Sequence, residues 1–193
     1  MKHIGILGGS FDPPHRGHIY ISLEAKKFLS LKEIWWLVTP QNPLKISSPA
    51  TYEQRLKNCR KIVKNHPILI KEIEKKINSK YSFYTIEYLH QHYSNIKFYW
   101  LMGADNLINF HRWKNWRQFF NQISIVVFKR HGYNNLALKS IASKTFANYQ
   151  INFDEFGKLQ FTTFPSWIFL NNKEIKISST EIRNQRNKLR GKY

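Results

Sequence analysis

Short apolar runs alternate with amphipathic segments along the chain, and no other feature restricts the fold as strongly. Runs rich in β-branched and aromatic residues predict strands at residues 3–7, 34–38, 68–70, 97–102, 124–128 and 167–170. Apolar residues at helical spacing predict helices at about residues 17–29, 52–65, 85–93, 106–122 (open to a break), 136–148 and 179–188. Strands that alternate with helices form a parallel sheet covered by helices. The expected fold class is therefore α/β.

The chain of 193 residues is about the size of one domain. It contains no internal repeat and no low-complexity linker, so we expect a single domain over residues 1–193. The stretch 39–50 holds three prolines and is long enough to predict a functional loop. Residues 150–165 have no clear pattern, and we assign them no chemistry.

Lysine and arginine outnumber aspartate and glutamate by 31 to 12, which gives a formal net charge of +19. Such a charge attracts polyanions, but the basic residues are scattered and form no dense stripe. A general bias towards lysine explains most of the charge. The sequence has no zinc-finger or RNA-recognition signature, so a nucleic-acid-binding protein is the weaker alternative and no specific nucleic-acid partner is expected.

Two absences bear on the compartment. No apolar run approaches the ~20 residues that a membrane span needs, and the first residues do not resemble a secretory signal. The lone Cys59 cannot form an internal disulfide, which fits a reducing compartment. We therefore expect a cytoplasmic protein with no membrane partner.

The first predicted strand leads directly into a glycine-rich segment, Gly8 to His18, and then into a helix. Glycines at the end of a strand let backbone amides approach a phosphate, and the helix N-terminus adds partial positive charge. His15 and His18 stand three residues apart around Gly17, so both imidazoles can face one ligand. A metal pair or two structural histidines are the alternatives, although no third ligand cluster accompanies the pair.

A second candidate for anion binding lies near the C-terminus. With Ser178 as N-cap and Glu181 bonded back to it, the amides of Ser179 and Thr180 stand at a helix start, and Arg183 follows one turn later. Taken alone, the segment also fits an ordinary capped surface helix. Two such helix starts after parallel strands would converge at the carboxyl edge of the sheet, where open α/β sheets bind ligands.

The paired segments GGSFDPPHRGH and ISSTEIR resemble the HxGH and ISSTxxR signatures of the nucleotidyltransferase superfamily. The segments SFYT and GADNLINFHRWKNW narrow the resemblance to the nicotinate-nucleotide (nicotinic acid mononucleotide) adenylyltransferases. The resemblance spans nearly the whole chain, from Ile4 to Arg183. It implies a Rossmann-like, doubly wound parallel sheet of the nucleotidyltransferase type, in which the ISSTEIR helix completes the ATP site. It also implies transfer of AMP from ATP to nicotinate mononucleotide, a step of NAD biosynthesis.

The resemblance also implies roles for individual residues. The residues implied to act in catalysis, by binding ATP phosphates and steadying the transition state, are His15, His18 and Arg183. The further residues implied to form the ATP site are Gly8, Gly9, Ser10, Phe11, Gly103, Asp105, Ser178, Ser179 and Thr180. Ser10 stands where the family commonly has threonine, a change that keeps the hydroxyl group.

On the mononucleotide side, the resemblance places the pyridine ring against Trp113. The other residues implied there are Asn42, Lys45, Thr85, Asp105 and Arg130. Trp113 also belongs to an aromatic series with Phe110, Trp116 and Phe119, which alone is more typical of a core stripe. His131 replaces the proline of the family's RPG motif, so the shape of that loop is open.

A phosphate nucleophile is already anionic, so the reaction needs no general base, and in-line displacement with Mg²⁺ on ATP suffices. No motif lowers the pKa of Cys59, so no covalent intermediate is expected. Phosphopantetheine and glycerol-phosphate nucleotidyltransferases share this chemistry but lack the GADxLxxFxxWxxW segment. The sequence leaves open a homo-oligomer, the identity of the metal, and the choice between the acid and amide forms of the mononucleotide.

Overall fold

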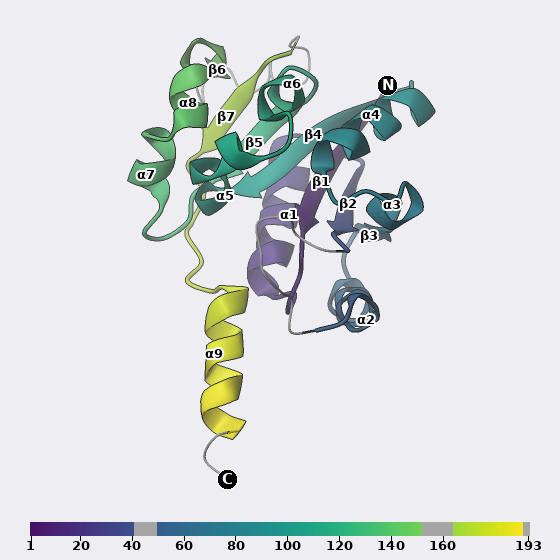
Figure 1. Ribbon diagram of the computed structural model, residues 1–193, viewed down its shortest axis with the longest axis vertical. Coiled ribbons are helices and arrows are strands. Elements are labelled where there is room, and N and C mark those ends of the chain that lie inside the picture. Colours follow the sequence, from purple (N-terminus) through teal and green to yellow (C-terminus); the bar gives the residue numbers. More distant parts are fainter. Residues whose placement is uncertain (41–49, 152–163, 191–193) are drawn as a thin grey trace.

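The computed structural model describes residues 1–40, 50–151 and 164–190, which form a seven-stranded sheet covered by helices (Figure 1). Every strand pairing in the sheet is parallel, and the strand order is β3-β2-β1-β4-β5-β7-β6. The strands are β1 (Lys2–Gly9), β2 (Glu33–Val38), β3 (Ile68–Lys71), β4 (Ile96–Gly103), β5 (Ser124–Phe128), β6 (Gln150–Ile151) and β7 (Trp167–Leu170). The expected doubly wound α/β sheet is confirmed.

Both faces of the sheet are buried, because successive side chains of a strand point to opposite faces and each face carries helices. In β4, Trp100 belongs to the core on one face, whereas Tyr99 and Leu101 belong to the core on the other. The face with Tyr99 packs against α1 (Arg16–Phe28) and α2 (Tyr52–Val63). The face with Trp100 packs against α3 (Ile73–Lys76), α4 (Ser82–His92), α5 (Ala104–Ile108), η1 (Phe110–Arg112), α6 (Trp116–Phe120), α7 (Asn134–Leu138) and α8 (Ile141–Thr145).

Two long helices expected from the sequence are divided in the structure. The segment 106–122 contains α5, η1 and α6, and Asn115 adopts a left-handed φ of 51° immediately before α6. The segment 136–148 is split by Ser140, whose hydroxyl group caps α8 by accepting from Ser143 N at 3.2 Å, and η2 (Ala147–Tyr149) follows. The helix expected from residue 85 begins at Ser82, and neither α3 nor β6 was predicted.

The order of the strands defines one special edge of the sheet. The chain winds outward from β1 through β2 to β3, then crosses to β4 on the other side of β1. The carboxyl ends of β1 and β4, at Gly9 and Gly103, therefore lie at a topological switch point, where successive loops diverge and leave a crevice.

A buried arginine of α2 ties together the loops that follow β1 and β2. The Arg55 side chain is only 1% exposed, and its guanidinium donates to the carbonyl oxygens of Ser10 at 2.6 Å, Thr39 at 2.8 Å and Pro40 at 2.7 Å. A planar guanidinium can serve several acceptors at once while keeping its charge. Arg55 therefore fixes the backbone on one side of the crevice.

The last helix, α9 (Ser179–Arg190), extends away from the body of the molecule (Figure 1). Its first turn is bonded to the loop after β1, since Ser179 Oγ donates to Pro13 O at 2.9 Å. In the described ranges, no helix has both the length and the apolar character needed to cross a membrane.

We expect Arg55→Met to destabilise the fold, because it leaves three carbonyl oxygens without their donor. Losing the partner of a buried polar group costs about 1–3 kcal/mol, and these losses overlap. The free energy of unfolding should fall by about 3 kcal/mol and the melting temperature by roughly 10 °C, as measured by circular dichroism during thermal unfolding.

Arg60→Met is the matched control on the same helix. Arg60 forms an exposed ion pair with Glu72 at 2.6 Å, a kind of contact that contributes about 0–1 kcal/mol. Equal losses of stability in the two variants would contradict the structural role assigned to Arg55.

Candidate active site

A cavity of about 350 Å³ opens at the carboxyl ends of β1 and β4, within the usual range for a small-molecule site. It is lined from the β1 side by Leu7, Gly8, Gly9, Ser10, Phe11, Asp12, His15, His18 and Ile21. The remaining lining residues are Thr39, Lys80, Tyr81, Ser82, Phe83, Trp100, Met102, Gly103, Asp105, Asn106, Arg112, Trp113, Lys114, Arg130, Ser178, Ser179 and Thr180. Residues far apart in the sequence thus share one crevice at the switch point.

The two histidines cap the first helix reciprocally. His15 is the N-cap of α1, and its Nδ1 accepts from Gly17 N at 3.2 Å, while His18 Nδ1 accepts from His15 N at 3.2 Å. The imidazole rings lie with their centroids 3.8 Å apart. A side chain at position 17 would not fit, because a Cβ there would lie 2.9 Å from both His15 Nδ1 and Ile177 Cγ2.

These contacts fix the protonation of the rings. A neutral imidazole whose Nδ1 accepts a hydrogen bond carries its proton on Nε2. Burial lowers the pKa of His15 to about 4, with a smaller contribution from Arg130, against the opposing effect of Glu181. At neutral pH His15 is therefore an uncharged hydrogen-bond donor, and it contributes no positive charge to the site.

The turn between β1 and α1 is held by an aromatic side chain. Phe11 has a positive φ of 48°, a conformation that costs energy for a bulky residue. Its ring stacks on Trp36 with centroids 4.6 Å apart and lies 4.9 Å from the ring of His18. Packing under the turn thus stabilises the strained backbone and supports the second histidine.

The first turn of α9 closes the cavity from the other end of the chain. Glu181 N donates to Ser178 Oγ at 3.1 Å, which makes Ser178 the cap that the sequence predicts. Arg183 donates to the carbonyl oxygen of Asp12 and, at 3.1 Å, to Thr180 Oγ1. The HxGH and ISSTEIR segments therefore meet, as the sequence analysis expects.

Trp113 lies at the boundary between the cavity and the core. It lines the cavity, and its ring also packs on Phe110 at 4.7 Å and edge-on against Trp100 at 6.0 Å. Trp116 instead packs on Phe146 at 5.9 Å and is not among the lining residues. Both tryptophans are partly buried against the same core cluster, and they differ in that Trp113 lines the cavity whereas Trp116 does not.

An ion pair spans the β4 and β5 side of the cavity. Arg130 Nη1 lies 2.7 Å from Asp105 Oδ2, and both side chains are about a quarter exposed. The backbone of Arg130 is held by Asn134, which donates in turn to Glu174 at 2.6 Å. His131, at the position of the family's proline, lies 3.3 Å from the same Glu174 carboxylate. Side-chain contacts therefore determine the shape of this loop, which could not be predicted from a sequence that has His131 in place of the motif's proline.

Some predicted residues lie elsewhere. Thr85 is fully buried and Arg183 lies behind Thr180, so neither side chain lines the cavity. Asn42 and Lys45 lie outside the described residues. The cavity is also lined by residues that the sequence did not single out: Thr39, Lys80, Tyr81, Ser82, Arg112 and Lys114. Thr39 follows a strand, and Tyr81 and Ser82 stand at the start of α4, which is the signal that could have found these three.

The cavity offers few ligands for a metal ion. Across the described ranges, no cluster of three or more His, Cys, Asp or Glu residues is arranged to hold one. The carboxylates among the lining residues are Asp12 and Asp105, and Asp105 is paired with Arg130. Mg²⁺ commonly keeps several waters and binds through one or two carboxylates and substrate phosphates, so this cavity fits a metal that arrives with a nucleotide.

Comparisons with known proteins agree with this geometry. Residues 6–185 match the cytidylyltransferase-like family. The probable nicotinate-nucleotide adenylyltransferase of Ruegeria sp. (strain TM1040) is 43% identical over 180 residues, covering 93% of this chain and 95% of the relative. The protein of that name from Bradyrhizobium sp. (strain BTAi1 / ATCC BAA-1182) is 40% identical over 182 residues, covering 94% and 95%.

Solved structures share the fold. The Plasmodium falciparum nicotinic acid mononucleotide adenylyltransferase complexed with NaAD has a TM-score of 0.70 at 19% identity, covering 95% of this chain and 83% of that chain. A structural likeness at this low identity is evidence for the fold alone. The family match and the relatives of about 40% identity cover nearly the whole sequence and are evidence for the family. The chain therefore belongs to the cytidylyltransferase-like family and, within it, to the nicotinate-nucleotide adenylyltransferases.

Proposed function

We propose that this protein transfers AMP from ATP to nicotinate mononucleotide, giving nicotinate adenine dinucleotide and pyrophosphate. The observation that carries the proposal is the meeting of the HxGH turn and the first turn of α9 in a cavity that Trp113 also lines. The relatives that bear the name of this activity support it.

In the proposed reaction, a phosphate oxygen of the mononucleotide attacks the α-phosphorus of ATP. The bond from that phosphorus to the bridging oxygen breaks, and pyrophosphate leaves with the electron pair. Because nucleophile and substrate are both anionic, the site must screen their repulsion and stabilise charge on the leaving group. Burial raises the pKa of Cys59 to about 12, which makes this thiol a poor nucleophile and favours direct transfer.

The ATP side is assigned to the two segments that meet. His15 and His18 donate from Nε2 to phosphate oxygens, His18 as charge develops, while the amides and hydroxyl groups of Ser179 and Thr180 bind the triphosphate. Arg183 supports this grip from outside the cavity lining, through its hydrogen bonds to Asp12 O and Thr180 Oγ1. The remaining proposed ATP contacts are Gly8, Gly9, Ser10, Phe11, Gly103, Asp105 and Ser178, all of which line the cavity.

We assign the acceptor side to Trp113, which stacks on the pyridine ring. Asp105 and Arg130 act there as a pair. Thr85 contributes through the first turn of α4, and Asn42 and Lys45 contribute through the loop 41–49. Stacking on indole adds about 0.5–1.5 kcal/mol beyond area burial, which is enough to orient the ring.

Mg²⁺ enters the proposal as part of the substrate, bound to the phosphates of ATP. When bound there it neutralises charge on the leaving pyrophosphate. We assign Asp12 to the metal-bearing phosphates, because its carboxylate lines the cavity beside the proposed triphosphate site. We also propose a cytoplasmic location. The cytoplasm supplies ATP and keeps thiols such as that of Cys59 reduced.

The test is pyrophosphate release from ATP, with nicotinate mononucleotide, nicotinamide mononucleotide, phosphopantetheine and glycerol phosphate offered in turn at fixed ATP. We expect release with the pyridine mononucleotides and none with the other acceptors. Release with phosphopantetheine or glycerol phosphate alone would assign the protein to another nucleotidyltransferase activity.

We expect His18→Ala to lower kcat by about 10²–10³, with a modest change in KM, because the lost donor acts mainly in the transition state. Steady-state kinetics with both substrates measures the effects on kcat and on KM separately. His92→Ala, which removes an exposed histidine of α4, is the control and should leave kcat unchanged. Near-normal kcat in His18→Ala would remove this residue from the mechanism.

We expect Trp113→Ala to raise KM for the mononucleotide about tenfold, in line with the loss of a stacking partner, while KM for ATP stays within about twofold. Trp116→Ala is the control, because that ring packs on Phe146 outside the cavity. It should lower the melting temperature without changing the ratio of the two KM values. An equal rise in both KM values in Trp113→Ala would favour a packing role for Trp113.

A further inference from the structure

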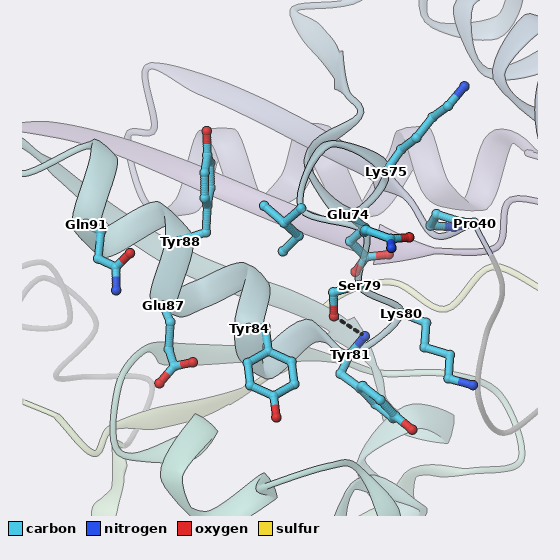
Figure 2. A pocket seen from close by; sticks show the side chains of 12 residues that line it. Pro40, Glu74, Lys75, Ser79, Lys80, Tyr81, Tyr84, Glu87, Tyr88 and Gln91 are labelled. Carbon is cyan, nitrogen blue, oxygen red and sulfur yellow. Dashed lines mark hydrogen bonds between the residues drawn. The ribbon is translucent and has the colours of Figure 1, made fainter.

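A second cavity adjoins the active site and contains a buried carboxyl group. The cavity is about 780 Å³, and Lys80 and Tyr81 line both it and the active-site cavity. Figure 2 shows Glu74 on the side of this cavity that carries Pro40 and Ser79, with the amines of Lys75 and Lys80 extending away from the carboxyl group. Glu74 itself is only 1% exposed.

The surroundings of Glu74 are unusual for an acidic side chain. Three hydroxyl groups face its carboxyl group: those of Thr39, Ser82 and Thr85. These hydroxyl groups are near enough to lower the pKa of Glu74, yet in the described part of the chain both carboxyl oxygens and Thr85 Oγ1 form no hydrogen bond of normal geometry. A buried polar group in this state costs free energy, which calls for a role beyond packing.

The hydroxyl groups connect Glu74 to the active site. Thr39 follows β2 and Ser82 begins α4, and both residues also line the active-site cavity. Thr85 stands one turn into α4 and belongs to the proposed mononucleotide pocket. Glu74 therefore lies directly behind the wall of that pocket, with solvent reaching its edge through the second cavity.

The protonation state of Glu74 decides what these hydroxyl groups can do. A neutral carboxyl group can donate as well as accept, whereas a carboxylate only accepts and draws every nearby O–H towards itself. With Glu74 neutral, the hydroxyl groups of Thr39 and Ser82 can donate into the active-site cavity. With Glu74 ionised, they turn away, and a buried negative charge stands behind a pocket proposed for an anion.

Burial, and not a neighbouring charge, has the largest effect on the pKa of Glu74. Burial raises its pKa to about 7, although the three hydroxyl groups act in the opposite direction. The titratable neighbour on α2 is Tyr52, whose own pKa is raised chiefly by burial and also by Glu72 and Glu74. Glu87, from α4, and Lys75 and Lys80 also line this cavity, with Glu87 on the side of the pocket away from the two lysines (Figure 2). Glu74 thus changes state near neutral pH.

We infer that Glu74 is a positioning residue for the acceptor: its neutral carboxyl group supports the cavity wall that Thr39 and Ser82 line, with the buried Thr85 behind it, and its ionisation weakens binding of the anionic mononucleotide. The inference rests on the proposed function, because it needs an anionic acceptor on this side of the cavity. It predicts that KM for the mononucleotide rises as the pH rises through about 7, whereas KM for ATP does not.

The test compares wild type, Glu74→Gln and Glu72→Gln from about pH 6 to about pH 8.5, with both KM values measured. The substrate phosphate titrates near pH 6 as well, so the readout is the ratio of wild-type to variant KM. For Glu74→Gln, the ratio of wild-type to variant KM for the mononucleotide should grow about fivefold across this range, because a buried negative charge repels the anionic substrate. The same ratio for ATP should stay constant.

Glu72→Gln is the matched control. It removes a carboxylate two residues before Glu74, and this carboxylate belongs to an exposed ion pair with Arg60. Its mononucleotide ratio should stay constant. A constant ratio for Glu74→Gln, or an equal change in the ATP ratio, would overturn the inference. A wild-type protein without AMP transfer would instead overturn the proposed function.

If Glu74→Gln does not fold, calorimetry on the wild type gives an independent answer. Binding of an anion should raise the pKa of Glu74, so mononucleotide binding near pH 7 should take up protons, measured in buffers of different ionisation heat. The substrate phosphate would release protons on meeting donors, which is the opposite sign. Proton release, or no exchange, would overturn the inference.

Discussion

The loops that build the crevice depend on one buried guanidinium. Arg55 donates to three carbonyl oxygens that follow two neighbouring strands. This arrangement holds the turn after β1 beside the backbone that follows β2 at Thr39 and Pro40. Because Thr39 is one of these three residues and also faces Glu74, the same contact orders both cavities.

The chemistry of the crevice comes mainly from backbone and neutral donors at the ends of secondary structure. His15 is uncharged at neutral pH, and its role is geometric because α1 and Gly17 fix its tautomer. Positive charge comes from Arg130, Arg112, Lys80 and Lys114 around the rim. Fixed donors on an α/β scaffold cost little reorganisation during a reaction, which suits a displacement between two anions.

Local signals in the sequence predicted the sheet and the two segments that meet at the cavity. The central strands are strongly apolar, and the glycine-histidine and hydroxyl-rich segments each cap a helix with their own side chains. A break in the helix 106–122 was left open and the break in 136–148 was not predicted, because the two breaks depend on the left-handed Asn115 and the cap of Ser140. Arg55 and Glu74 resemble ordinary helix-surface residues in the sequence, and only tertiary contacts bury them.

The attachment of α9 to the loop after β1 has a consequence for how the protein is made. Pro13 precedes Ser179 by 166 residues, and Asp12 precedes Arg183 by 171 residues. Translation therefore produces the turn after β1 well before the helix that is bonded to it, and these two contacts can form only after α9 has been made. Under the proposed function, a polypeptide that ended before Ser179 would lack one side of the proposed triphosphate site.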